Sequence, residues 1–137
     1  MKRNGARGEL VGTRILLVED ADDIRDAFGV LLRTEGASVS MAATGREAIE
    51  LAAQDTYDLL VTDLGLPDIP GEILIREVLA TASPRPRVVV LTGYGEPYTG
   101  RARAAGADVV LTKPIEWTGL LRELRKGRAA APTALAG

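Results

Sequence analysis

The chain has 137 residues, 46% of them hydrophobic and 26% charged, which is typical of one globular domain and not of a disordered chain. Its 17 basic and 19 acidic side chains give a net charge of −2, too balanced to indicate a nucleic-acid or membrane surface as partner. Cysteine and histidine are absent, which excludes disulfides, thiolate or imidazole metal sites, Ser-His-Asp relays and phosphohistidine. Any chemistry must use carboxylates, hydroxyls, amines and the backbone.

The beginning of the chain predicts a flexible leader. Residues 1–13 are rich in glycine and arginine, show no periodicity and lack the apolar stretch of a secretion signal. Further along, the longest strongly apolar runs are only four residues, too short to span a bilayer. We therefore expect no membrane partner and a cytoplasmic location.

Five segments predict β-strands. Four of them are short continuous apolar runs, which are typical of strands buried on both faces of a parallel sheet: residues 15–18, 59–61, 88–91 and 109–111. The fifth segment, residues 38–42, alternates apolar and polar side chains, as a half-buried or edge strand does.

Stretches with helical spacing of apolar residues lie after each strand: residues 24–32, 48–52, 74–79, 96–105 and 117–124. Gly36 is a plausible end of the first helix, and Thr44 with Glu47 forms a capping-box pattern before the second. Pro114 lies near the first turn of the last helix, which we expect to end near Lys126. Residues 127–137 are then predicted to be a flexible tail.

Strand and helix thus alternate five times with short connections. This order predicts a doubly wound α/β fold, with a parallel five-stranded sheet and helices on both of its faces. Ligands of such sheets bind beyond the carboxyl ends of the strands. The residues that follow each strand are therefore the candidates for function.

Charged and hydroxyl side chains follow four of the predicted strands. Glu19 and Asp20 come after the first strand, Asp63 after the third, Thr92 after the fourth and Lys113 after the fifth. Because three clustered carboxylates repel one another, their site favours a cation. An all-oxygen half-shell, completed by a backbone carbonyl of the loop after Asp63, suits Mg²⁺.

A metal with open positions beside a lysine suits a phosphoryl group. Asp63 could be the nucleophile that becomes an aspartyl phosphate. Lys113 could neutralise the charge on the phosphoryl oxygens, and Thr92 could offer a hydroxyl to one of them.

These motifs resemble the receiver domain of two-component response regulators, over residues 14–126. The matching segments are LLVED (16–20), DLLVTDLGLPDIPG (58–71), VLTG (90–93), AGAD (105–108) and KP (113–114). The resemblance implies a flavodoxin-like receiver fold, and is closest to receivers of hybrid kinases or free-standing ones.

The resemblance also implies roles for the residues at the strand ends. Asp63 takes a phosphoryl group from a sensor histidine kinase or a histidine phosphotransfer protein, Thr92 is the switch hydroxyl, and Lys113 binds the phosphate. The implied Mg²⁺ ligands are oxygen donors: Asp20, Asp63, the Gly65 carbonyl and, through water, Glu19. The chain is then a signalling receiver, not an enzyme acting on other substrates.

The residues near the site also bear on how switching and dephosphorylation would work. Family members often carry an aromatic residue three positions before the lysine, where this chain has Val110, so the usual coupling to the threonine is in question. Tyr94 is a candidate substitute. Gly65 and Gly93 flank the site without side chains, which predicts a site open to water and fast dephosphorylation.

The output is expected to be a contact with another protein, because the tail after Lys126 is too short for a DNA-binding domain. The resemblance points to the surface formed by helix 96–105, the fifth strand and the last helix. Two alternatives remain: a phosphorylation-independent adaptor, which Val110 keeps open, and a small hydrolase with an aspartyl-phosphate intermediate. Such hydrolases resemble Asp-x-Asp, and this chain has Gly65 at the second acid position.

Overall fold

Five parallel strands form the centre of the molecule, and their order in the sheet is β2-β1-β3-β4-β5. The computed structural model describes residues 8–136, and of residues 127–136 the backbone alone. The strands are β1 (Arg14–Val18), β2 (Ser38–Ala42), β3 (Leu59–Thr62), β4 (Arg87–Thr92) and β5 (Val109–Thr112). The order reverses between β1 and β3, so the predicted doubly wound parallel sheet is confirmed.

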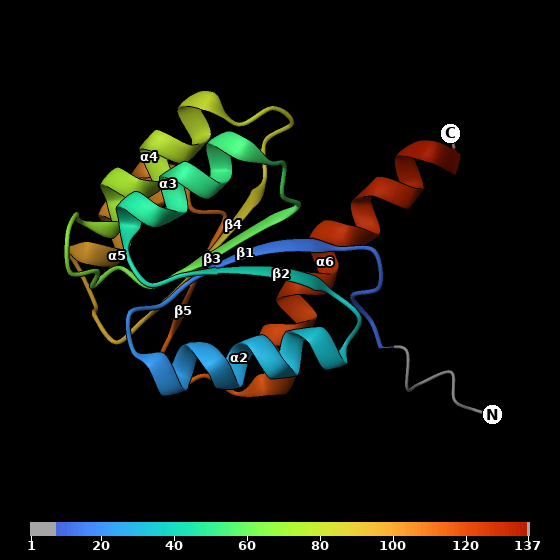
Figure 1. Cartoon of the computed structure of the whole chain (residues 1–137), viewed down its shortest axis with the longest axis horizontal. Coiled ribbons are helices and arrows are strands. Elements are labelled where there is room, and N and C mark those ends of the chain that lie inside the picture. Colours follow the sequence, from blue (N-terminus) through green and yellow to red (C-terminus); the bar gives the residue numbers. More distant parts are fainter. Residues whose placement is uncertain (1–7, 137) are drawn as a thin grey trace.

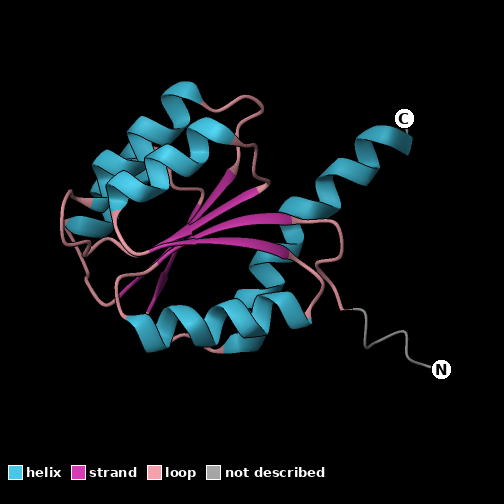
Figure 2. Cartoon of the chain, in the orientation of Figure 1, coloured by secondary structure: helices cyan, strands magenta, loops and turns pink. Residues whose placement is uncertain are grey.

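Helices cover both faces of the sheet (Figures 1 and 2). One face carries α3 (Gly45–Gln54), α4 (Gly71–Thr81) and α5 (Tyr98–Ala105), and the other carries α2 (Asp22–Thr34) and α6 (Trp117–Ala136). Among the described helices, none combines the length and the apolar character that crossing a membrane requires.

The apolar runs of the central strands supply two separate cores. Leu16 and Val18 pack with the α3–α5 layer, while Ile15 and Leu17 pack toward α2 and α6. This division follows from the alternation of side chains along a strand. Burial on both faces explains why these strands are continuously apolar and why their parallel pairing was predictable.

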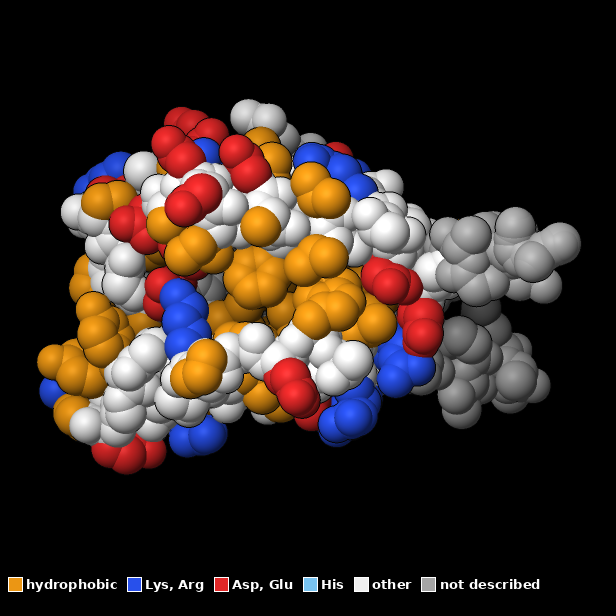
Figure 3. All heavy atoms as spheres, turned by 90° about the horizontal axis from the view of Figure 1, so that it is seen from below, with side chains coloured by type: hydrophobic (Ala, Val, Ile, Leu, Met, Phe, Trp, Pro, Cys, Tyr) orange, Lys and Arg blue, Asp and Glu red, His pale blue; other side chains and the backbone are white. Residues whose placement is uncertain are grey.

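The face of α2 and α6 leaves apolar side chains uncovered (Figure 3). Hydrophobic side chains gather in the middle of this face. On α2, the exposed ones are Ile24, Val30 and Leu31. Apolar patches of this kind are typical of surfaces that contact other proteins.

Two predicted helix ends are confirmed in detail. Gly36 ends α2 with a φ of 96°, and its N–H donates to the Arg33 carbonyl at 2.9 Å, as in a glycine-terminated helix. At the start of α3, the Thr44 hydroxyl accepts a hydrogen bond from the Glu47 N–H at 3.1 Å. The Glu47 carboxylate accepts in turn from the N–H of Ala43, one residue before the cap.

The structure differs from the predicted flexible leader over residues 8–13. Leu10 is fully buried in the core beneath α2 and α6, and its N–H donates to the Glu35 carbonyl at 2.8 Å. Thr13 is also buried, and its carbonyl accepts from Ser38 at 2.9 Å. A single leucine among polar residues gives no periodicity, so the sequence pattern could not show this anchor. Residues 1–7 of the predicted leader lie outside the described residues.

Replacing Leu10 with alanine is expected to destabilise the fold by about 2–5 kcal/mol, because a fully buried leucine leaves a cavity when truncated. Urea unfolding followed by circular dichroism measures the change. Val11 is exposed and adjacent, so Val11→Ala is the matched control, with an expected change within about 0.5 kcal/mol. Equal stabilities of the Leu10→Ala variant and the unmodified chain would contradict the packing of this segment.

The predicted end of the last helix near Lys126 is wrong, because α6 continues to Ala136. The added stretch is rich in alanine, the residue with the highest helix propensity, although it also contains Pro132. These last turns project beyond the sheet (Figure 1). The flexibility of residues 127–137 stays a prediction, and Gly137 lies outside the described residues.

Candidate functional site

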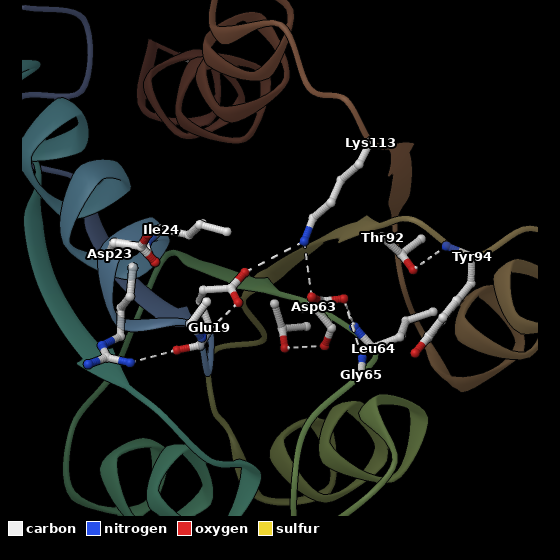
Figure 4. Close-up of polar contacts among 12 residues, drawn as sticks. Glu19, Asp23, Ile24, Asp63, Leu64, Gly65, Thr92, Tyr94 and Lys113 are labelled. Carbon is white, nitrogen blue, oxygen red and sulfur yellow. Dashed lines mark hydrogen bonds and ion pairs between the residues drawn. The ribbon is translucent and has the colours of Figure 1, made fainter.

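The carboxyl ends of the strands bring the predicted site residues to one edge of the sheet (Figure 4). Glu19 and Asp20 follow β1, and Asp63 follows β3, which is the neighbour of β1. One carboxylate oxygen from each of the three acids lies within 4.8 Å of the others. Lys113 follows β5, and its side chain reaches back across the edge to this cluster.

Asp63 lies at the centre of the cluster with its carboxylate held on both sides. Its Oδ1 accepts hydrogen bonds from the backbone N–H groups of Leu64 and Gly65, at 2.6 and 3.3 Å. Its Oδ2 accepts from Lys113 Nζ at 3.1 Å. The side chain is 15% exposed, so the carboxylate is fixed in direction but still accessible from outside.

Glu19 is the buried acid of the cluster, and Asp20 is exposed. Burial raises the pKa of the Glu19 carboxyl above its usual value, although a hydrogen bond from the Ala21 N–H and the charge of Lys113 oppose this. Asp63 adds a repulsion that raises the pKa further. Glu19 is therefore an acid whose charge is costly in the metal-free site.

Lys113 supplies the compensating charge. Its Nζ lies 3.1 Å from Asp63 Oδ2 and 3.7 Å from Glu19 Oε1. Burial acts to lower the pKa of Lys113, but the hydrogen bond and charge of Asp63, together with Glu19, raise it above its usual value. The lysine is thus held in its charged form beside the carboxylates, where it can also meet the oxygens of an anionic group.

The donor set fits Mg²⁺. Three carboxylates offer hard oxygen ligands within 4.8 Å of one another. This is somewhat wider than the spacing of about 3–4 Å between the ligands of an octahedral Mg²⁺ ion, so the oxygens would draw together around it. The exposed Asp20 leaves one side open to solvent, which suits an ion that keeps several waters. Lys113 alone cannot neutralise three carboxylates, so a divalent cation relieves the remaining repulsion.

In the metal-free protein, Glu19→Gln is expected to raise the melting temperature at pH 7. Because the folded-state pKa of Glu19 is raised, its contribution to stability is fully present below the usual value of 4.5 and is lost as the pH rises through the folded-state pKa. Glutamine stays neutral throughout, so the difference should vanish at about pH 4. Thermal melting in EDTA at both pH values measures this. A glutamine variant that melts below the unmodified chain at pH 7 would contradict it.

Thr92 is fully buried at the end of β4. Its hydroxyl oxygen accepts a hydrogen bond from the N–H of Tyr94 at 3.0 Å, so the hydroxyl is tied to the loop that follows the strand. Val110, on the neighbouring β5, is partly buried against the core of the α3–α5 layer. The role of Thr92 as a switch hydroxyl stays a prediction.

The Tyr94 side chain lies beside Gly65, while the openness of the site to water and fast dephosphorylation stay predictions. A Cβ placed on Gly65 would be 3.1 Å from the Tyr94 hydroxyl oxygen and 3.6 Å from its ring carbons. At Gly93, by contrast, a Cβ would meet nothing within 4 Å, as expected. The position of an aromatic residue between two glycines signals a turn but not the direction of its ring, so sequence reasoning missed this contact.

The family follows from a comparison with family models. The model for the response regulator receiver domain matches residues 15–125. The chain belongs to this family. As a receiver domain of two-component response regulators, it is similar to the response regulator protein PilR of Pseudomonas aeruginosa, at 37% identity over 112 residues. These residues are 81% of this chain but only 25% of PilR, so the chain spans about a quarter of that relative.

Two solved structures are similar to this receiver domain in fold. The receiver domain of sensor histidine kinase PA1611 from Pseudomonas aeruginosa has a magnesium ion in its active-site cleft, with a TM-score of 0.77 and 30% identity over 85% of this chain and 97% of that one. A response regulator protein from Burkholderia pseudomallei contains a phosphorylated aspartic acid and a calcium ion, with a TM-score of 0.76 and 27% identity over 91% and 75%. The predicted receiver fold is therefore confirmed.

Proposed function

We propose that Asp63 is the phosphoryl acceptor of this receiver domain. The observation that carries the proposal is the arrangement around its carboxylate. Lys113 donates to Oδ2 at 3.1 Å while two backbone N–H groups hold Oδ1, and the acids of β1 lie within 4.8 Å. This leaves an oriented nucleophile beside a fixed positive charge, which is the arrangement that phosphoryl transfer requires. The phosphorylated aspartic acid of the Burkholderia pseudomallei structure supports the same assignment.

We propose that the phosphoryl donor is a histidine, a residue that this sequence does not itself contain. A sensor histidine kinase or a histidine phosphotransfer protein fits this chemistry. An oxygen of Asp63 forms a bond to phosphorus while the bond from phosphorus to the donor imidazole nitrogen breaks. The imidazole leaves with the electron pair and takes up a proton. Lys113 stabilises the negative charge on the phosphoryl oxygens, and Thr92 offers its hydroxyl to one of them.

Mg²⁺ is the proposed cofactor, with ligands from Asp20, Asp63 and the Gly65 carbonyl, and with Glu19 acting through water. Bound there, the ion supplies positive charge between the carboxylates and the phosphoryl oxygens. The magnesium ion in the active-site cleft of the PA1611 receiver domain supports the choice of ion. The residues of this chain orient the acceptor and hold the compensating charge whether or not the ion is present.

Phosphorylation can be tested without the cognate kinase. The purified chain is incubated with a small-molecule phosphodonor and Mg²⁺ and then weighed by intact-mass spectrometry. The expected result is a gain of one phosphoryl group that disappears when EDTA replaces Mg²⁺. No mass gain at any donor concentration would overturn the proposal.

We expect the signal to leave through a protein contact. The proposed surface is formed by α5, β5 and α6, the fourth and fifth helices of the predicted set with the fifth strand. In this proposal the chain is not an enzyme acting on other substrates, because it promotes only its own phosphorylation and dephosphorylation. The balanced net charge argues against nucleic acid as a partner, and the cytoplasmic location stays a prediction.

Val110 favours a second candidate function, that of an adaptor which binds its partner in either phosphorylation state. This position lacks the aromatic side chain through which many receivers couple to their threonine. Partner affinity measured with and without a beryllofluoride phosphate mimic distinguishes the two functions. A change in affinity supports the switch, and equal affinities support the adaptor.

A further inference from the structure

The backbone of Glu19 is held on both sides, just before the exposed acid of the cluster. Its N–H donates to the Ala42 carbonyl on β2 at 3.0 Å, and its carbonyl accepts from Arg25 Nη1 at 2.9 Å. This carbonyl belongs to the planar peptide bond that leads into Asp20, so its direction sets where the Asp20 side chain begins. Arg25 therefore acts on the backbone from which that acid projects.

Arg25 is itself held in place. It lies in the first turn of α2, with its side chain only 16% exposed. Its second terminal nitrogen, Nη2, donates to Asp22 Oδ1 at 2.7 Å. One planar guanidinium thus bridges the loop carbonyl and a carboxylate at the start of the helix. A bridge of this kind uses the fixed fork of donors that arginine offers and lysine does not.

The start of α2 depends on this contact because its N-cap residue is Ala21. Most helices begin with a side chain that accepts a hydrogen bond from the first turn, and the methyl group of alanine cannot do so. The Ala21 N–H donates instead to the Glu19 carboxylate, at 3.1 Å. The loop that carries Asp20 is therefore secured by Arg25 and by another acid of the same cluster.

We propose that Arg25 positions Asp20 for the divalent cation. By fixing the Glu19 carbonyl, it keeps the Asp20 carboxylate within reach of an ion that Asp63 also binds. This role rests on the proposed Mg²⁺ site. Asp63 is fixed by three hydrogen bonds to its own carboxylate, whereas Asp20 is exposed. The place of Asp20 within 4.8 Å of the other acids thus depends on the backbone that Arg25 orients.

The charge of Arg25 acts in the opposite direction. A guanidinium near the acid cluster repels a divalent cation, so removal of the charge alone would strengthen Mg²⁺ binding. Loss of the contact with the Glu19 carbonyl would weaken Mg²⁺ binding, because Asp20 must then be ordered at the moment the ion binds. The two effects differ in sign, and a positioning role requires that the contact outweigh the charge.

The test is Arg25→Met, which removes both the fork and the charge but keeps a long side chain that favours a helix. Melting temperature measured against Mg²⁺ concentration gives the dissociation constant of each protein. We expect the affinity of Arg25→Met for Mg²⁺ to fall about three- to tenfold, which is less than the loss of a ligand itself would cause. The melting temperature in EDTA shows that the variant is folded, and reports any purely structural effect separately.

Arg33→Met is the matched control. Arg33 lies in the last turn of α2, and its Nη2 also donates to a backbone carbonyl, that of Val39, at 2.9 Å. The variant loses the same charge and the same kind of contact at the other end of the helix. Its Mg²⁺ affinity should stay within about twofold of that of the unmodified chain, because distant exposed charges are screened.

A second measurement needs no metal. Amide hydrogen exchange of Ala21, followed by NMR in EDTA, reports local opening of the loop. The exchange should be faster in Arg25→Met than in the unmodified chain, and unchanged in Arg33→Met.

The other outcomes decide against the positioning role. Unchanged or stronger Mg²⁺ binding by Arg25→Met overturns it, and so does an equal loss in Arg33→Met. Unchanged exchange of Ala21 in Arg25→Met also overturns it, because the loop is then ordered without the arginine. If Mg²⁺ does not stabilise the unmodified chain, the proposed cofactor has failed, and this inference fails with it. If the unmodified chain responds and only the Arg25 comparison fails, the proposed function stands alone.

Discussion

Asparagine at position 63 is expected to abolish phosphorylation of this receiver domain. The amide has the shape of the carboxylate, so it can still accept the N–H groups of Leu64 and Gly65. It lacks the anionic oxygen that attacks phosphorus, and it cannot form an acyl phosphate. Intact-mass measurement with the small-molecule donor and Mg²⁺ should show no gain for Asp63→Asn, even at the highest donor concentration.

Asp68→Asn is the matched control, because Asp68 lies on the same loop with a structural role. Its carboxylate accepts the N–H groups of Gly45 and Arg46, both at 2.9 Å, at the start of α3. The mass gain in this variant should equal that of the unmodified chain. Persistence of the gain in Asp63→Asn would show that another residue is the acceptor, and loss of the gain in both variants would point to a general effect of the loop.

Removing the Asp20 carboxylate is expected to cause the largest loss of Mg²⁺ affinity. A ligand that binds only the folded state stabilises it by about 2.7 kcal/mol at one hundred times its dissociation constant. Asp20 is the exposed member of the acid cluster, so it is the one that can meet a hydrated ion first. In Asp20→Asn the affinity should fall by at least about 10- to 100-fold. Melting temperature measured against Mg²⁺ concentration reports this directly.

Asp23→Asn is the control for that titration. Asp23 lies three residues further on, in the first turn of α2, and its carboxylate accepts the N–H of Ile24 at 3.0 Å. It carries the same charge as Asp20 but lies outside the cluster, so its Mg²⁺ response should match that of the unmodified chain. An unchanged response in Asp20→Asn would rule out the proposed ligand set.

The sheet, and the edge of it that carries the site residues, were predictable because both depend on local sequence patterns. Continuous apolar runs mark strands that are buried on both faces, and their alternation with helical spacing fixes the parallel topology. Lys113 and Asp63 are fifty residues apart in the sequence, yet their side chains meet at 3.1 Å. That contact follows from topology alone, because the carboxyl ends of parallel strands share one edge.

The features that were missed depend on packing without a local pattern. Leu10 is one apolar residue in a polar segment, and only the hollow between the core strands and two distant helices gives it a place. The Tyr94 side chain lies beside Gly65, and this contact joins two loops that follow different strands, so no local sequence pattern shows it. The length of α6 was underestimated because residues 127–136 lack the apolar spacing that marked the helix before Lys126, although they contain five alanines.

The burial of Leu10 bears on how shortened forms of this protein are prepared. Cutting the gene at the family match, which begins at residue 15, would delete a leucine that packs with Leu32 and Leu124. The Glu9 carboxylate, which pairs with Arg125 of α6, would be lost as well. A trimmed version would therefore loosen one of the helices proposed to face the downstream partner, and its weak binding could be mistaken for the behaviour of the whole domain.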